Sequence, residues 1–151
     1  MRATALRFVF ACMCCAAVSL PVAYGADSSP AADAPDLRSV RTEIKAKQYD
    51  KALAELKVLA ARYQQPDVYS LYGHALWKTG NPTQGMVYYN KALELQPSHK
   101  GALEYQGELF IELGQIDKAK ENLAKLNRLC LFGCEEYNDL KEAIEHAPKK
   151  G

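Results

Sequence analysis

The sequence predicts an all-α protein, a helical solenoid built from helix pairs and closed by a C-terminal helix. Three observations carry this prediction: a pattern that repeats about every 34 residues, apolar residues at helical spacing, and helix breaks at matching places in successive repeats. With 48% hydrophobic and 25% charged residues, the composition excludes collagen-like, coiled-coil and wholly disordered chains. The net charge of +1 argues against a nucleic-acid-binding protein, which usually carries a large basic excess.

The repeat is clearest in the glycines. Gly73 and Gly80 recur 34 residues later as Gly107 and Gly114. We expect Gly80 and Gly114 to end the first helix of their units, because left-handed backbone geometry costs little only for glycine. Small residues are expected where the two helices of one unit cross, since a larger side chain would push them apart. These crossing positions are Ala52, Gly73, Gly85, Gly107 and Ala119.

This pattern resembles the tetratricopeptide repeat family. The middle unit, 66–99, keeps the family's aromatic, glycine, alanine and closing proline positions, although Pro82 stands where an apolar residue is usual. The third unit, 100–129, has Gln106 at an apolar position, and the first, about 33–65, has an atypical first helix. The resemblance implies a right-handed solenoid of about three tetratricopeptide helix pairs, followed by a C-terminal capping helix.

The N-terminal residues, 1–25, are typical of a secretory signal peptide. Arg2 and Arg7 precede a short apolar run, and the small residues Ala23 and Gly25 form a cleavage site. The run is shorter than the roughly 20 apolar residues needed to span a bilayer. The alternatives are a retained membrane anchor and a lipoprotein signal that uses one of the leader cysteines, Cys12, Cys14 or Cys15.

The expected organisation after cleavage is a flexible linker at 26–35, a repeat domain at 36–147 and a short tail at 148–151. The last helix of the domain, at 135–147, is the expected cap, because its apolar residues recur at helical spacing between acidic ones. Cleavage changes the net charge from +1 to −1 and removes three of the five cysteines. We expect an exported protein without stable membrane insertion, in the periplasm or, alternatively, secreted.

Cys130 and Cys134 are the two cysteines left after cleavage, and they flank Leu-Phe-Gly. In an oxidising compartment we expect a structural disulfide that fixes the direction of the capping helix. A redox-active pair and free thiols are the alternatives. Two thiols and three scattered histidines make no metal-ligand set, so no metal or cofactor is expected.

No catalytic constellation is apparent in the sequence. There is no nucleophile elbow, no pair of histidines four residues apart and no glycine-rich phosphate loop. The acidic residues Glu104, Glu108 and Glu112 lie at helical spacing, which is typical of an exposed or groove-facing stripe. We therefore expect no enzyme.

The resemblance to tetratricopeptide repeats also implies a concave groove, lined by the first helix of each unit, that holds peptide segments. Trp77 is the strongest candidate for a ligand anchor, with packing against the neighbouring first helix as the alternative. The lysine and asparagine pattern with which some family members bind a terminal carboxylate is not present, and only Arg41, Lys45 and Lys78 offer positive charge at the expected groove positions. Carried over position by position, the expected groove residues are Arg41, Lys45, Ser70, His74, Trp77, Lys78, Glu104, Glu108 and Ile111, with Leu37, Ile44, Asp67 and Glu112 beside them.

The functional hypothesis is an exported, non-catalytic adaptor that binds another protein or peptide in this groove. Charge is graded along the chain, from basic in 36–65 to acidic in 135–147, which suits an extended ligand of mixed charge or stacking of copies. One alternative is a periplasmic thiol–disulfide protein acting through Cys130 and Cys134. Another is a structural module that self-associates through its ends.

Overall fold

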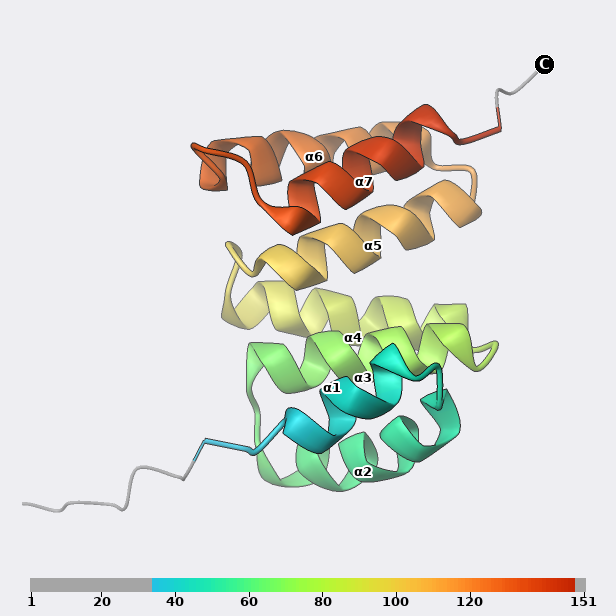
Figure 1. Cartoon of the computed structure of the whole chain (residues 1–151), viewed down its shortest axis with the longest axis vertical. Coiled ribbons are helices and arrows are strands. Elements are labelled where there is room, and N and C mark those ends of the chain that lie inside the picture. The colour runs from blue at the N-terminus through green and yellow to red at the C-terminus, as the bar shows by residue number, and fades with distance from the viewer. Residues whose placement is uncertain (1–33, 149–151) are drawn as a thin grey trace, which may run out of the picture. The chain divides into compact units, whose positions relative to one another are not determined.

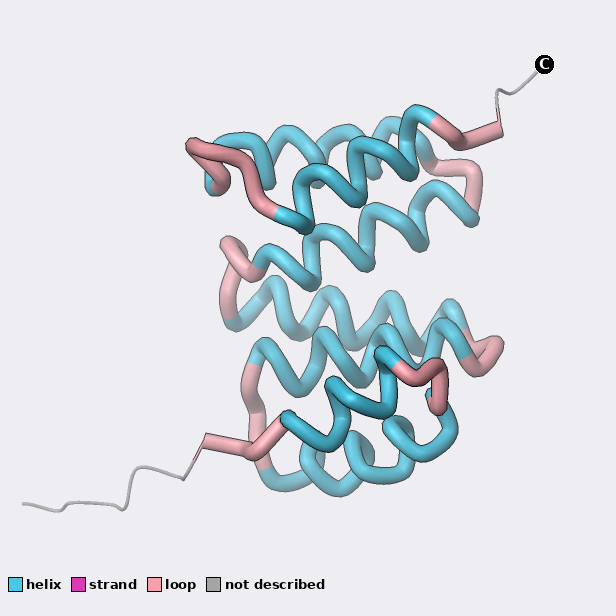
Figure 2. Tube along the Cα trace, viewed as in Figure 1, coloured by secondary structure: helices cyan, strands magenta, loops and turns pink. Residues whose placement is uncertain are grey.

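A computed structural model describes residues 34–148. Within this range the chain forms seven helices joined by short loops, and no strand (Figure 2). None of these helices is long and apolar enough to cross a membrane. The expected signal peptide at 1–25, the linker up to residue 33 and the tail at 149–151 lie outside the described residues.

The helices follow one another as three antiparallel pairs and a final single helix (Figure 1). Each pair packs on the next, α2 on α3 and α4 on α5, while α7 packs on both helices of the last pair. This arrangement confirms the predicted all-α solenoid. The helices are α1 (Arg38–Lys45), α2 (Tyr49–Arg62), α3 (Pro66–Lys78), α4 (Pro82–Leu95), α5 (Lys100–Glu112), α6 (Ile116–Leu129) and α7 (Glu135–Glu145).

The turn inside each pair repeats the same backbone geometry. A left-handed residue follows the first helix, and the next N–H donates to a carbonyl of the last helical turn. Gly80 (φ +87°) and Gly114 (φ +70°) take the left-handed position, as predicted, whereas Lys47 (φ +56°) takes it in the first pair. The three bonds run from Gln48 to Glu43 (2.8 Å), from Asn81 to Leu76 (2.9 Å) and from Gln115 to Phe110 (2.7 Å).

Close approach of α3 and α4 depends on two glycines. A β-carbon on Gly73 would lie 2.8 Å from Cε1 of Tyr89 and 2.9 Å from the carbonyl oxygen of Gly85. Gly107 plays a different part from the one predicted. A β-carbon there would lie 2.6 Å from the methyl groups of Leu140 in α7, so this glycine makes room for the cap rather than for its pair partner α6.

Gln106, which stands at an apolar position of the repeat, belongs to a buried polar network. Its side chain is 6% exposed, and its Nε2 donates to Oδ1 of Asn90 at 2.8 Å. Its Oε1 accepts from Nδ2 of Asn122 at 2.9 Å, and the same Asn122 nitrogen donates to the carbonyl of Leu103 at 3.1 Å. The network joins α4, α5 and α6, and because its members are paired, the buried polar groups cost little stability.

Candidate functional site

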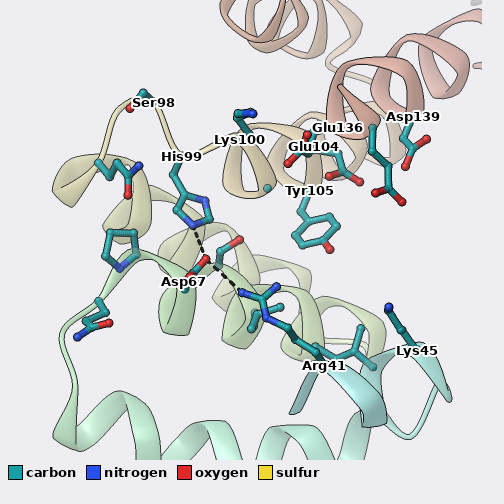
Figure 3. Close-up of a pocket in the computed structure, with 18 residues that line it drawn as sticks. Arg41, Lys45, Asp67, Ser98, His99, Lys100, Glu104, Tyr105, Glu136 and Asp139 are labelled. Atoms are coloured by element: carbon teal, nitrogen blue, oxygen red, sulfur yellow. Dashed lines mark hydrogen bonds and ion pairs between the residues drawn. The ribbon is translucent and has the colours of Figure 1, made fainter. Parts of the chain in front are cut away.

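A pocket of about 890 Å³ lies among α1, α3, α5 and α7. The first helix of every pair therefore contributes to it, together with the cap. In Figure 3, Arg41 and Lys45 of α1 lie on one side of the pocket, and Glu104, Glu136 and Asp139 lie across it. The pocket is thus polar, with opposite charges on facing walls.

The basic wall contains a hydrogen-bonded network centred on Asp67 of α3. Its Oδ1 lies 2.9 Å from Nε2 of His99 and 3.5 Å from the guanidinium of Arg41 (Figure 3). His99 precedes α5, and its Nδ1 accepts the backbone N–H of Ala102 at 3.0 Å, so the ring proton sits on Nε2 and donates to Asp67. This hydrogen bond, with the charge of Arg41, holds the pKa of Asp67 below its ordinary value. The network ties the three first helices together at the pocket.

The acidic wall is built by α5 and α7. Glu104 is only 8% exposed, and burial raises the pKa of its carboxyl to about 8, aided by Glu108 and by the acids of α7. Burial also raises the pKa of Glu108, with a further contribution from Asp139. The pKa of Tyr105 rises to about 12 for the same reason, burial first and then the charge of Glu104. Near neutral pH, Glu104 is therefore mostly protonated.

The second helix pair matches a known repeat. A family model described as tetratricopeptide repeat matches residues 66–99, which cover α3, α4 and the loop to α5. This segment of the chain is a tetratricopeptide repeat. No curated protein matches the chain. Helix pairs of this family act as scaffolds for protein–protein interaction, and the pocket lies on the face formed by their first helices.

Several residues predicted for the groove do line the pocket. They come from all three first helices, two from α1 and one each from α3 and α5. Two neighbours that were carried over with them, Ile44 and Asp67, line it as well. The four predicted groove residues that line the pocket are Arg41, Lys45, Ser70 and Glu104.

Trp77 does not line the pocket. The indole is 9% exposed and packs with Tyr89 and Leu109 in the core between the second and third pairs. Its Nε1 donates to Oε2 of Glu112 at 2.8 Å, and the ammonium of Lys78 lies 3.5 Å from the ring centroid. The alternative prediction, packing against the neighbouring first helix, describes its position.

The remaining predicted groove residues, like Trp77, do not line the pocket. His74 is 7% exposed, with its ring 4.3 Å from that of Tyr105 and 5.9 Å from that of Tyr49. Burial lowers its pKa to about 4, with Lys78 adding to the shift. Ile111 packs against the apolar cluster of α5, α6 and α7 instead, and Glu108 acts on the pocket only through its charge.

The sequence reasoning missed the groove residues that the repeat pattern does not cover. His99 immediately precedes α5, and this position in the sequence is the one indication of its capping role. Glu135, Glu136 and Asp139 line the pocket from α7. Their acidity is apparent in the sequence, but the repeat pattern does not indicate that the cap faces the groove.

Cys130 and Cys134 lie between α6 and α7, with their Sγ atoms 2.04 Å apart and their Cα atoms 5.6 Å apart. Gly133 in this loop has a φ of +82°, which the tight turn requires. The neighbouring Leu131 and Phe132 are 82% and 100% exposed. The close cysteine pair lies between the last helix pair and the cap, next to the helix that forms the acidic wall.

Proposed function

We propose that the protein is an exported, non-catalytic adaptor that holds a segment of a partner protein in the pocket among α1, α3, α5 and α7. The observation that carries this proposal is the pocket itself, about 890 Å³ in volume and lined by residues from all three helix pairs. Grooves formed by helix faces are a recurring way of holding peptide segments.

The charges of the pocket support binding of a segment in one direction. The α1 wall carries Arg41 and Lys45, and the α5 and α7 wall carries Glu104, Glu136 and Asp139. Opposed walls of this kind favour a ligand with complementary charges and penalise its reversal.

Export is supported by the residues before the domain and by the cysteine pair. The predicted cleavage leaves a chain that begins at Ala26 and retains only Cys130 and Cys134. N-terminal sequencing of the protein from an oxidising compartment should give Ala26. Alkylation without reductant should label neither cysteine. A retained leader, or two free thiols, would contradict this part of the proposal.

The pocket is tested by site-specific photo-crosslinking in the native compartment. A photoreactive residue replaces Lys45, which is exposed at the pocket, or Lys57, which is exposed on α2 outside it. We expect Lys45 to crosslink a defined partner and Lys57 to give none of that product. Equal products from both positions, or none from Lys45, would refute the assignment of the pocket.

A further inference from the structure

Glu104 is a buried carboxyl that no residue of the described chain neutralises. Its side chain lines the pocket at 8% exposure. None of the ion pairs within 34–148 involves it. A buried carboxylate without a partner is costly, and this cost keeps Glu104 protonated near neutral pH until a cation pairs with it.

The groups around Glu104 make this cost larger. Glu108 lies on the same helix, α7 adds its three acids, and α3 adds the paired Asp67. Lys100, four residues before Glu104 on α5, and Lys45 of α1 line the same pocket, but neither forms an ion pair with Glu104. Tyr89 of α4 and Tyr105 of α5 are neutral neighbours. The one cation on α1 with a defined contact, Arg41, is engaged by Asp67. Acids dominate the immediate surroundings of Glu104, and no cation within residues 34–148 pairs with its carboxyl.

A second, independent observation points to a ligand in the same pocket. Ser70 is 2% exposed and lines the pocket, and its hydroxyl has no hydrogen-bond partner within residues 34–148. A buried hydroxyl normally finds a partner, so an unpaired one at a pocket marks a place where a ligand group completes the bonding.

From these contacts we propose that the pocket takes a lysine or arginine side chain of an extended peptide segment, with the Glu104 carboxylate as its ion-pair partner. The inference rests on the proposed function, because it assumes that a partner segment enters the pocket. Tyr105 lies beside Glu104 and offers an aromatic surface to the same cation. Glu136 and Asp139 extend the negative wall above it, and Ser70 is available to the polar groups of the segment.

The test is an NMR titration of the mature chain with small probes. Nα-acetyl-lysine methylamide and Nα-acetyl-arginine methylamide are compared with their uncharged counterparts, the norleucine and citrulline compounds. We expect saturable shifts at Glu104 and Tyr105 with a cationic probe, and binding at least tenfold weaker for its neutral counterpart. Affinity should rise on the order of a hundredfold from pH 6 to pH 9, because ionised Glu104 is the form that pairs with the cation and its ionised fraction rises by about that factor.

Glu104→Gln keeps the shape of the side chain and removes its charge, so it should weaken the cationic probe about tenfold. Glu142→Gln is the matched control, since Glu142 is exposed on α7 and does not line the pocket. It removes the same charge and should leave binding unchanged. The relative affinity of the two cationic probes identifies which side chain the site prefers.

Equal binding of charged and neutral probes, or equal affinity in the two variants, would overturn the inference. Its failure is separable from failure of the proposed function. If Lys45 still crosslinks a partner while no cationic probe binds, the adaptor function stands and the cation site is wrong. If the probes bind at Glu104 but Lys45 crosslinks nothing, the cation site stands and the adaptor function is wrong.

Discussion

Replacing Glu104 by glutamine should stabilise the protein, and the gain should depend on pH. Folding raises the pKa of this carboxyl from 4.5 to about 8, chiefly by burial. The native state therefore binds the proton more tightly than the unfolded chain does. The contribution of Glu104 to the free energy of unfolding is therefore largest below pH 4.5, decreases between pH 4.5 and about pH 8, and stays constant at higher pH.

The shift of roughly 3.5 pKa units corresponds to roughly 5 kcal/mol of lost stability at alkaline pH. Glutamine has nearly the same shape and no charge to desolvate. Glu104→Gln should thus match the original protein near pH 5 and exceed its free energy of unfolding by several kcal/mol at pH 9. Urea denaturation followed by circular dichroism at pH 5, 7 and 9 measures this difference, with Glu142→Gln as the exposed control. A difference that stays constant across the three pH values would refute the reasoning.

Three further predictions concern helix packing at two glycines, the left-handed turn at Lys47 and the protonation of His74. Gly73→Ala should lower the free energy of unfolding by about 1–2 kcal/mol, because overpacking outweighs the gain in helix propensity. Gly101→Ala, whose new β-carbon meets nothing closer than 3.7 Å, should raise the free energy of unfolding by up to about 1 kcal/mol. Thermal unfolding measures the effect of both glycine substitutions. Lys47→Gly should raise the free energy of unfolding by about 0.5–1 kcal/mol, because glycine relieves the left-handed backbone at φ +56°. The control Lys57→Gly, inside α2, should lower it by about 1 kcal/mol. Both are measured by chemical denaturation, and a loss of stability at Lys47 would contradict this explanation. The His74 imidazole should titrate near pH 4 by NMR, with stability falling by roughly 3 kcal/mol as the pH drops from 6.5 to about 4, and a midpoint near 6.5 would show that the ring is not buried.

The parts of the fold that could be predicted are those encoded by local geometry and repeated along the chain. Gly80 and Gly114 identify their turns because left-handed backbone favours glycine wherever the pattern recurs. Lys47 shows the limit of this signal, since the first pair has the same turn without the glycine.

The parts that could not be predicted depend on how neighbouring units meet. Trp77 occupies a repeat position compatible with either the groove or the contact between units, and only the crossing of α3 and α5 decides between them. Gly107 looked equivalent to Gly73, yet Leu140 of the cap fills the space beside it. The cap lies outside the repeat, so no register could place Glu136 and Asp139 at the pocket.

Trp77 is an intrinsic fluorescent probe of one contact in the solenoid. It is the chain's single tryptophan, buried between the second and third pairs, with Glu112 as hydrogen-bond partner and Lys78 over its ring. Intrinsic fluorescence therefore reports on the contact between the second and third helix pairs, which we call the joint. Separation of α3 from α5 would let water reach the indole and move its emission to longer wavelength, while fraying at α1 or α7 would leave the signal unchanged. Because the pocket spans this joint, bending of the solenoid around a bound segment would be readable without any label.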